Sequence, residues 1–189
     1  MERVHFRGNT PKINVVKHTF LDICNEIIGR WRNYGARVSA LSMEEFEEIY
    51  ALRSGIEGLA ARLIAKKVES EHLPALRQEL NALEKLTQNA DLFLYLRREW
   101  QFRVHCYQLT QRQRLLKQVL LLREHSERYI YLTYHEETRV AESFDFHCRL
   151  LDAFEKQAGL QAENILQEAL RWTLTNAGPL VESMLVTLK

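Results

Sequence analysis

The chain has 189 residues, of which 46% are hydrophobic and 27% charged, and its formal net charge is +1. Only seven glycines and three prolines interrupt it, a composition that excludes a fibrous or disordered protein and favours a helical globular one. A chain of this length can bury a full hydrophobic core, but two ordinary domains would be cramped.

Residues 1–40 are harder to assign to elements than the rest of the chain. Up to residue 37 they carry seven Lys or Arg against three Asp or Glu. Such a basic excess is typical either of a tail that faces nucleic acid or of a solvated terminus with chance charges. The pattern predicts one amphipathic helix over 19–32, a turn, and a short strand over 36–40.

A series of amphipathic helices is predicted from residue 42 onward. Ser42 is an N-cap candidate, and Glu45, three residues later, completes a capping box. Apolar residues then recur every three or four positions to about residue 67 and over 71–88, 91–110, 113–136, 140–157 and 161–187. Helix-breaking residues mark three sites: Asn89, Ala158-Gly159 and Gly178-Pro179. Six helices with short links predict an all-α antiparallel bundle over residues 41–189.

Several predicted helices carry ionisable side chains within the apolar stripe that should face the core. These are Arg53 and Glu57, then Glu99 and Arg103, then Arg123 after Leu116, Val119 and Leu120, and finally His147. A buried charge must be paired or bind something, because its desolvation is unfavourable by several kcal/mol. Helix bundles build their ligand and metal sites in this interior. The six residues therefore predict a polar chamber that binds a ligand.

A purely structural interpretation is open for each of these residues. Arg53 and Glu57 are four residues apart, as are Glu99 and Arg103, so each pair can neutralise itself along one helix. His147 can be a hydrogen-bonded core histidine. The convergence of four stripes favours the chamber over this alternative.

Enzymatic motifs are sparse. A carboxylate-bridged di-iron bundle needs Glu-x-x-His pairs on facing helices, and Glu69-x-x-His72 lies at a helix boundary. The sequence has no Gly-rich phosphate loop and no Gly-x-Ser-x-Gly motif. The cysteines, of which Cys106 and Cys148 fall in the bundle, have neither metal nor redox spacing. We expect a protein that is not an enzyme.

The location expected from the sequence is the reducing cytoplasm. The three cysteines are an odd number, and no secretion signal is recognisable. No apolar run approaches the roughly 20 residues of a membrane helix. We therefore expect no membrane partner.

Three stretches together resemble GntR-family transcriptional regulators of the FadR type. Residues 35–57 read GARVSALSMEEFEEIYALRSGIE, similar to the junction at which the wing of a winged helix-turn-helix enters the FCD effector-binding domain. Residues 98–116, REWQFRVHCYQLTQRQRLL, and 144–154, FDFHCRLLDAF, resemble the two histidine-bearing helices of that domain. The resemblance covers residues 35–178 and implies a dimer whose helical bundle binds a small organic acid or similar metabolite.

The resemblance also implies a divalent-metal site, from which this sequence departs. The four ligand positions of the family read Glu99, Arg103, His147 and Ala169 here. Alanine offers no ligand atom, and a permanently protonated arginine repels a cation. We therefore predict a chamber without a metal cofactor, in which Arg103 pairs with Glu99 or grips an anionic ligand directly.

The DNA-binding half of the family is reduced in this sequence. Residues 1–40 can supply one helix and a wing strand, so they are interpreted as a truncated winged helix-turn-helix remnant, followed by an FCD-like domain over 41–189. The preferred hypothesis is a metabolite-responsive, DNA-binding transcriptional regulator that forms a homodimer. The alternative is a stand-alone ligand-binding and dimerisation module without direct DNA binding.

Overall fold

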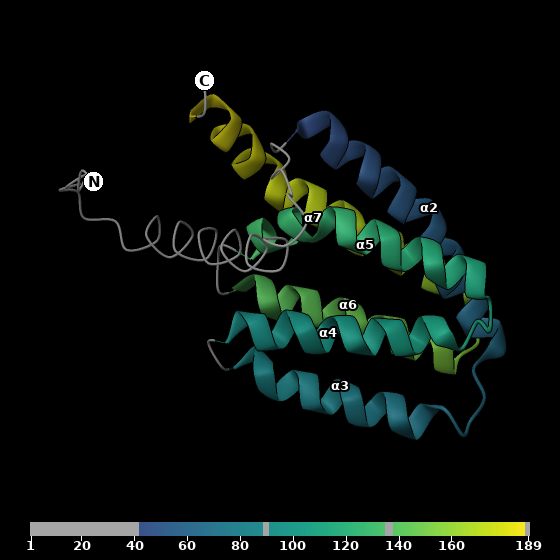
Figure 1. Ribbon diagram of the computed structural model, residues 1–189. Coiled ribbons are helices and arrows are strands. Elements are labelled where there is room, and N and C mark those ends of the chain that lie inside the picture. Colours follow the sequence, from purple (N-terminus) through teal and green to yellow (C-terminus); the bar gives the residue numbers. More distant parts are fainter. Residues whose placement is uncertain (1–41, 89–90, 135–137, 188–189) are drawn as a thin grey trace, which may run out of the picture. The chain divides into compact units, whose positions relative to one another are not determined.

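The computed structural model describes residues 42–88, 91–134 and 138–187. Six helices and no strand occupy this part of the chain (Figure 1): α2 (Met43–Lys67), α3 (Leu73–Thr87), α4 (Leu92–Gln108), α5 (Gln113–Thr133), α6 (Thr138–Glu155) and α7 (Gly159–Thr187). The predicted all-α bundle is therefore confirmed. Within these residues no helix has the length and apolarity needed to cross a bilayer. The helix expected at 19–32 and the strand expected at 36–40 lie outside the described residues.

Helix α2 begins where the capping signal predicted. The Ser42 side chain accepts a hydrogen bond from the Glu45 amide at 3.3 Å, which satisfies one of the free N–H groups of the first turn. The other half of the expected capping box is replaced by a tertiary contact, because the Ser42 amide donates to the Tyr129 hydroxyl at 3.3 Å. The Glu45 carboxylate also turns towards α5, where it pairs with Arg128. The start of α2 is thus tied to α5.

The link from α6 to α7 forms as expected, with a glutamine in the left-handed conformation. Gln157 has φ 52°, its amide donates to Phe154 O at 2.9 Å, and the next amide, that of Ala158, donates to Ala153 O at 2.9 Å. These two bonds are those of a Schellman motif, which ends a helix by satisfying its last carbonyls. The turn lets α7 start only a few residues after α6 ends.

Gly159 opens α7 at a point of close approach to α2. A Cβ atom at this position would lie 3.1 Å from the Arg62 carbonyl oxygen and 3.2 Å from Arg62 Cγ. Because backbone cannot move aside as a side chain can, only glycine fits without a shift of one helix. This contact positions α7 along α2.

The break predicted at Gly178-Pro179 is wrong, because α7 continues through both residues to Thr187. Proline removes one backbone hydrogen bond from a helix and strains the preceding turn. Ala177 and Val181, on either side of it, are both fully buried. Tertiary packing of these two side chains therefore holds the helix together against its local preference.

The inward position expected for Leu120 on α5 is wrong. The sequence placed it on the inner side with Arg123, but Leu120 is 41% exposed, whereas its neighbour Val119 is fully buried. Adjacent residues differ by about 100° around a helix, so Leu120 falls beyond the edge of the buried stripe.

The helices pack in two groups of three. Helix α2 lies along α7 and α5, while α3 lies against α4 and α6 (Figure 1). One continuous apolar cluster, which includes Ile64, Leu83, Phe102 and Phe154, links the helices. The six ionisable residues that the sequence placed on the inner stripes lie within this interior rather than on the surface.

Candidate functional site

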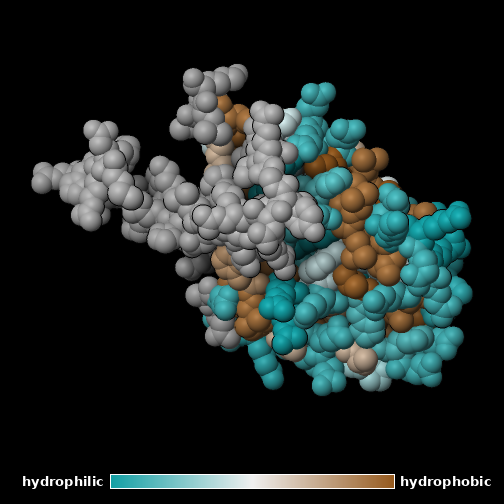
Figure 2. Space-filling model, in the orientation of Figure 1, coloured by the Kyte–Doolittle hydropathy of each residue, from teal (hydrophilic) through white to brown (hydrophobic). Residues whose placement is uncertain are grey.

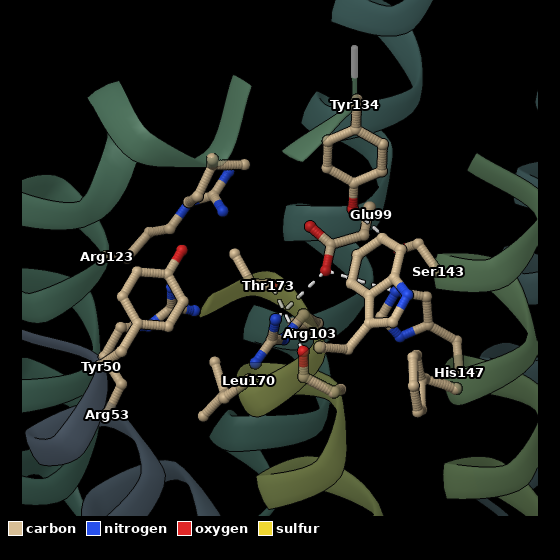
Figure 3. A pocket seen from close by; sticks show the side chains of 14 residues that line it. Tyr50, Arg53, Glu99, Arg103, Arg123, Tyr134, Ser143, His147, Leu170 and Thr173 are labelled. Carbon is tan, nitrogen blue, oxygen red and sulfur yellow. Dashed lines mark hydrogen bonds and ion pairs between the residues drawn. The ribbon is translucent and has the colours of Figure 1, made fainter. Parts of the chain in front are cut away.

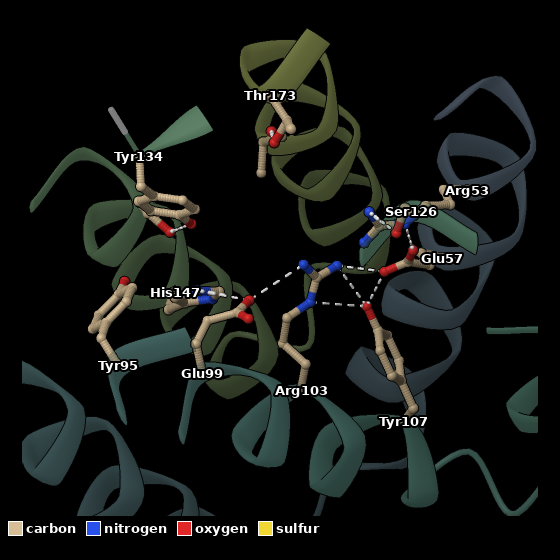
Figure 4. Close-up of polar contacts among 12 residues, drawn as sticks. Arg53, Glu57, Tyr95, Glu99, Arg103, Tyr107, Ser126, Tyr134, His147 and Thr173 are labelled. Carbon is tan, nitrogen blue, oxygen red and sulfur yellow. Dashed lines mark hydrogen bonds and ion pairs between the residues drawn. The ribbon is translucent and has the colours of Figure 1, made fainter. Parts of the chain in front are cut away.

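All six residues predicted to form a chamber are buried. Their exposed fractions are 1% for Arg53, 0% for Glu57, 3% for Glu99, 8% for Arg103, 9% for Arg123 and 4% for His147. They come from four helices and form two neighbouring groups, an ion network and the wall of a small hollow (Figures 3 and 4).

Glu57 is the centre of the ion network (Figure 4). Arg53, one turn earlier on α2, donates from Nε to Glu57 Oε1 at 2.6 Å. From α4, Arg103 donates from Nη2 to Glu57 Oε2, and the Tyr107 hydroxyl donates to the same oxygen at 2.5 Å. Arg53 also donates from Nη1 to Ser126 Oγ on α5 at 3.1 Å. One buried carboxylate therefore ties α2 to α4, while Arg53 connects it to α5.

Arg103 joins the network to the hollow. Its Nη1 donates to Glu99 Oε1, one turn earlier on α4, at 3.3 Å, and its Nε and Nη2 donate to the Tyr107 hydroxyl at 3.2 and 2.8 Å. Residues 99, 103 and 107 thus form a ladder of i, i+4 contacts on one face of α4. The expected pairing of Arg103 with Glu99 is present, but the partner shared with α2 was not foreseen.

The ion network keeps its two carboxylates ionised. Burial by itself would raise the pKa of Glu57, but Arg53 and Arg103 outweigh it and lower that pKa below its ordinary value. Burial likewise opposes ionisation of Glu99, whereas His147 and Arg103 beside it bring its pKa well below the usual range. Both glutamates therefore carry a full negative charge at neutral pH.

A small hollow lies beside Glu99 (Figure 3). Five of the six predicted residues line it, and the sixth, Glu57, lies outside its wall. The other lining residues are Tyr50, Ile130, Tyr134, Ser143, Phe146, Ala169, Leu170, Trp172 and Thr173. The space open to water-sized molecules is about 30 Å³, enough for two or three waters, since about 10–15 Å³ is needed for each. A larger guest requires side chains of the wall to move.

Polar groups without hydrogen bonds face this hollow. Among the described residues, the Tyr50 hydroxyl and both ring nitrogens of His147 are buried without a hydrogen-bond partner. His147 Nε2 lies 3.3 Å from Glu99 Oε1, within ion-pair distance but without hydrogen-bond geometry. Burial raises the pKa of Tyr50 despite Arg53 and Arg123 nearby, so its hydroxyl remains a neutral donor. Buried polar groups left unpaired in this way are uncommon.

Arg123 is the cation of the hollow that lacks a counter-ion. Its guanidinium lies over the Trp100 ring, 4.9 Å from the ring centroid, and within the described part of the chain it forms no ion pair with a carboxylate. Across the hollow stand Glu99 and His147 (Figure 3). The guanidinium is therefore free to bind an anion in a site that is largely shielded from water.

The formal charge of the interior is positive. Counting arginine and glutamate alone, Arg53, Arg103 and Arg123 face Glu57 and Glu99, which leaves one positive charge in excess. Four of these five groups neutralise one another through the contacts above. The excess charge is thus located on Arg123, at the hollow.

A divalent metal does not fit the family's ligand positions in this chain. The Arg103 guanidinium donates to Glu99 at 3.3 Å, so a fixed positive charge lies beside the one carboxylate available. Ala169, the fourth position, lines the hollow without a ligand atom. Within the described residues no group of three His, Cys, Asp or Glu side chains is placed to hold a metal ion. Cation binding here would have to overcome the charge of Arg103.

Several residues of the site were not singled out from the sequence. Tyr107 could have been found, because it continues the four-residue spacing of Glu99 and Arg103 along α4. Ser126, Tyr134 and Trp172 carried no comparable signal, since they reach the site only through the packing of α5 and α7.

The fold and the site together define an all-α bundle with a charged hollow in its interior. The sequence matches the FCD domain family over residues 48–171, about two thirds of the chain, and the chain belongs to that family. The expected kinship with GntR-type regulators is thereby confirmed, and the FCD family is regulatory rather than catalytic.

The structure has a relative among solved structures. It is similar to E. coli McbR/YncC with a TM-score of 0.69 and 15% sequence identity, over 89% of this chain and 85% of that one. At this identity the similarity concerns the fold. No curated protein sequence matches the chain significantly.

Proposed function

We propose that this FCD domain senses a small monocarboxylate, which binds in the hollow without a metal ion. The observation that carries the proposal is Arg123, a buried guanidinium with no carboxylate partner among the described residues. A single carboxylate matches the single excess charge and suits the two parallel N–H groups of arginine. The Tyr50 hydroxyl and His147 ring, both without hydrogen bonds, would bind further polar atoms of the guest.

In this proposal Arg103 takes the electrostatic place of the family's metal. Its contacts with Glu57, Glu99 and Tyr107 hold it rigidly at the edge of the hollow. A fixed cation of this kind stabilises a nearby anion without the coordination shell that a metal needs. Guests with two or three carboxylates would bring surplus negative charge into a site that already holds Glu99.

Binding is expected to move α5. The hollow is too small for an organic acid as it stands, and Arg123, the proposed anchor, is on α5 against the Trp100 ring of α4. A guest that draws Arg123 inward would favour one spacing of α4 and α5 over another. Ligand binding would then shift a pre-existing equilibrium between two arrangements of the bundle, as in other effector-controlled proteins.

Thermal unfolding with chosen anions tests the ligand site. Acetate, lactate and benzoate, each compared with chloride at equal ionic strength, are expected to raise Tm more than succinate or citrate does. The Arg123→Met variant should lose this response, while Arg149→Met, which removes an exposed guanidinium paired with Glu168 at 2.6 Å, should keep it. A preference for citrate, or an unchanged response in Arg123→Met, would contradict the proposal.

Metal binding is tested separately. After dialysis against Zn²⁺ or Ni²⁺ and removal of free metal, we expect far less than one ion for each chain by atomic emission. Stoichiometric metal that is lost in a His147→Ala variant would show that the hollow is a metal site after all.

We further propose that the whole chain regulates transcription as a DNA-binding homodimer, with residues 1–40 as a remnant of the DNA-binding half. The basic excess before residue 38 and the FCD domain that follows support this assignment. Fluorescence anisotropy of labelled duplex DNA at low salt, where phosphate contacts are strongest, is expected to show binding that benzoate or lactate alters. Binding of those acids by a protein indifferent to DNA would instead favour the stand-alone module.

A further inference from the structure

One face of α2 carries apolar side chains on the outside of the bundle. Leu52 is 49% exposed, and Ile56, Leu59 and Leu63 are partly exposed. These four residues, here called the α2 strip, are three or four positions apart and so share one face of the helix. A broad hydrophobic patch covers the region where α2 and α5 lie (Figure 2). Such a patch on a soluble domain commonly marks an interaction surface.

A groove runs beside the α2 strip and adds to this surface. It has a volume of about 550 Å³ and lies between α2 and the start of α5. Its walls are formed by Ile56, Leu59, Leu63, Arg112, Gln113, Arg114, Leu115 and Gln118. The surface is therefore hollowed and apolar along its centre and basic at one end.

The charges at the two ends of the α2 strip have opposite sign. The first turn of α2 carries Glu44 and Glu45, and its last turn carries Lys66 and Lys67. Glu48 and Lys66 are exposed and continue the three- and four-residue spacing of the strip at either end. Glu48 lies nine residues before position 57 and Lys66 nine residues after it. Position 57 is also near the midpoint of the four apolar residues of the α2 strip.

This symmetry makes the surface complementary to itself. If a second α2 lies antiparallel on the first and crosses it near residue 57, Glu48 of each copy meets Lys66 of the other. The two pairs lie about 27 Å apart along the helix, at 1.5 Å for each residue. Leu52 of each copy then packs near Leu63 of the other. A twofold dimer needs a self-complementary patch of this kind.

We propose that the α2 strip and its groove bind a second copy of this chain, antiparallel and twofold. The inference specifies the surface of the dimer in the proposed function, but it does not depend on the ligand. Arg123 and the hollow lie on the inner side of α5, and the strip lies on the outer side of α2. The proposal for the dimer surface and the proposal for the ligand site can therefore be tested, and refuted, independently.

The proposed pairing is tested by exchanging charges in the chain of residues 1–189 and measuring its dimerisation by sedimentation velocity at micromolar concentration. Glu48→Lys and Lys66→Glu should each weaken the dimer about tenfold or more, because each replaces two attractive contacts by two repulsive ones. The double variant Glu48→Lys/Lys66→Glu should restore the dimer. An equimolar mixture of the two single variants should form heterodimers, in which both pairs are attractive again.

A matched pair of leucine variants tests whether the apolar residues of the α2 strip contribute to the dimer. Leu52→Glu should give monomers, whereas Leu160→Glu, at a leucine of α7 that is 66% exposed, should leave the dimer intact. Circular dichroism and a cooperative thermal unfolding transition would show that each variant is folded. A wild-type protein that is monomeric, single charge variants that dimerise normally, or equal effects of both leucine variants would each overturn the proposal.

Discussion

Replacement of Glu57 by glutamine would show how much the buried ion network stabilises the fold. Glutamine keeps the size of the side chain but removes the charge, so Arg53 and Arg103 lose a counter-ion that now lies 2.6 Å from Arg53 Nε. Removal of one partner from a buried pair lowers stability by about 3–5 kcal/mol. With a urea m-value of about 2 kcal/mol/M, the midpoint should fall by about 2 M.

The control for this experiment is on the same helix. Glu47→Gln changes an exposed carboxylate of α2 that lies outside the α2 strip and should alter stability by no more than about 0.5 kcal/mol. Both variants would be measured by urea unfolding under far-UV circular dichroism, at a concentration that is varied to separate unfolding from dissociation. Equal effects of the two variants, or a loss below about 1 kcal/mol for Glu57→Gln, would refute the stabilising role of the network.

The same variant has a defined pH dependence. The pKa of Glu57 is lower in the folded chain than its ordinary value of 4.5 because its arginines outweigh its burial. A lowered pKa contributes stability that is fully present above the unfolded value and is lost as the pH falls. The difference in the free energy of unfolding between wild type and Glu57→Gln should therefore narrow by up to about 1.4 kcal/mol per pH unit below roughly pH 4.5. A difference that stayed constant down to about pH 3 would show that the arginines do not hold Glu57 ionised.

Four further substitutions test the ion balance of the hollow and the backbone of the bundle. Arg123→Met should leave the urea midpoint unchanged or raise it, because an unpaired buried charge is removed, and a large decrease would mean that Arg123 has a structural partner. Gly178→Ala should stabilise α7 by about 0.5–1 kcal/mol, since its Cβ meets nothing within 4 Å, whereas Gly159→Ala should destabilise it against the Arg62 backbone; calorimetry that shows the same sign for both would contradict this. Gln157→Gly should raise Tm, because glycine relieves the left-handed strain at φ 52°, and an unchanged or lower Tm would argue that the glutamine side chain compensates.

The sequence by itself determined the helices and the chemical type of their inner faces. The three- and four-residue spacing from Phe46 to Ile64 places α2 and its buried face, and the four-residue spacing of Arg53 and Glu57 is sufficient to predict their ion pair. Ser42 likewise marks the start of the bundle, because its side chain caps an amide only three residues later in the chain. These features depend on contacts within one or two helical turns, which the spacing of residues along the chain contains directly.

Only the tertiary structure decided which charges meet and which remain free. Glu57 reaches Arg103 across 46 positions of sequence, which takes it out of the wall of the hollow and leaves Arg123 as the cation without a counter-ion there. The packing of Ala177 and Val181 also carries α7 through Pro179. Contacts between helices depend on how their axes are placed and rotated against one another, and that placement follows from the packing of the whole core rather than from any local spacing.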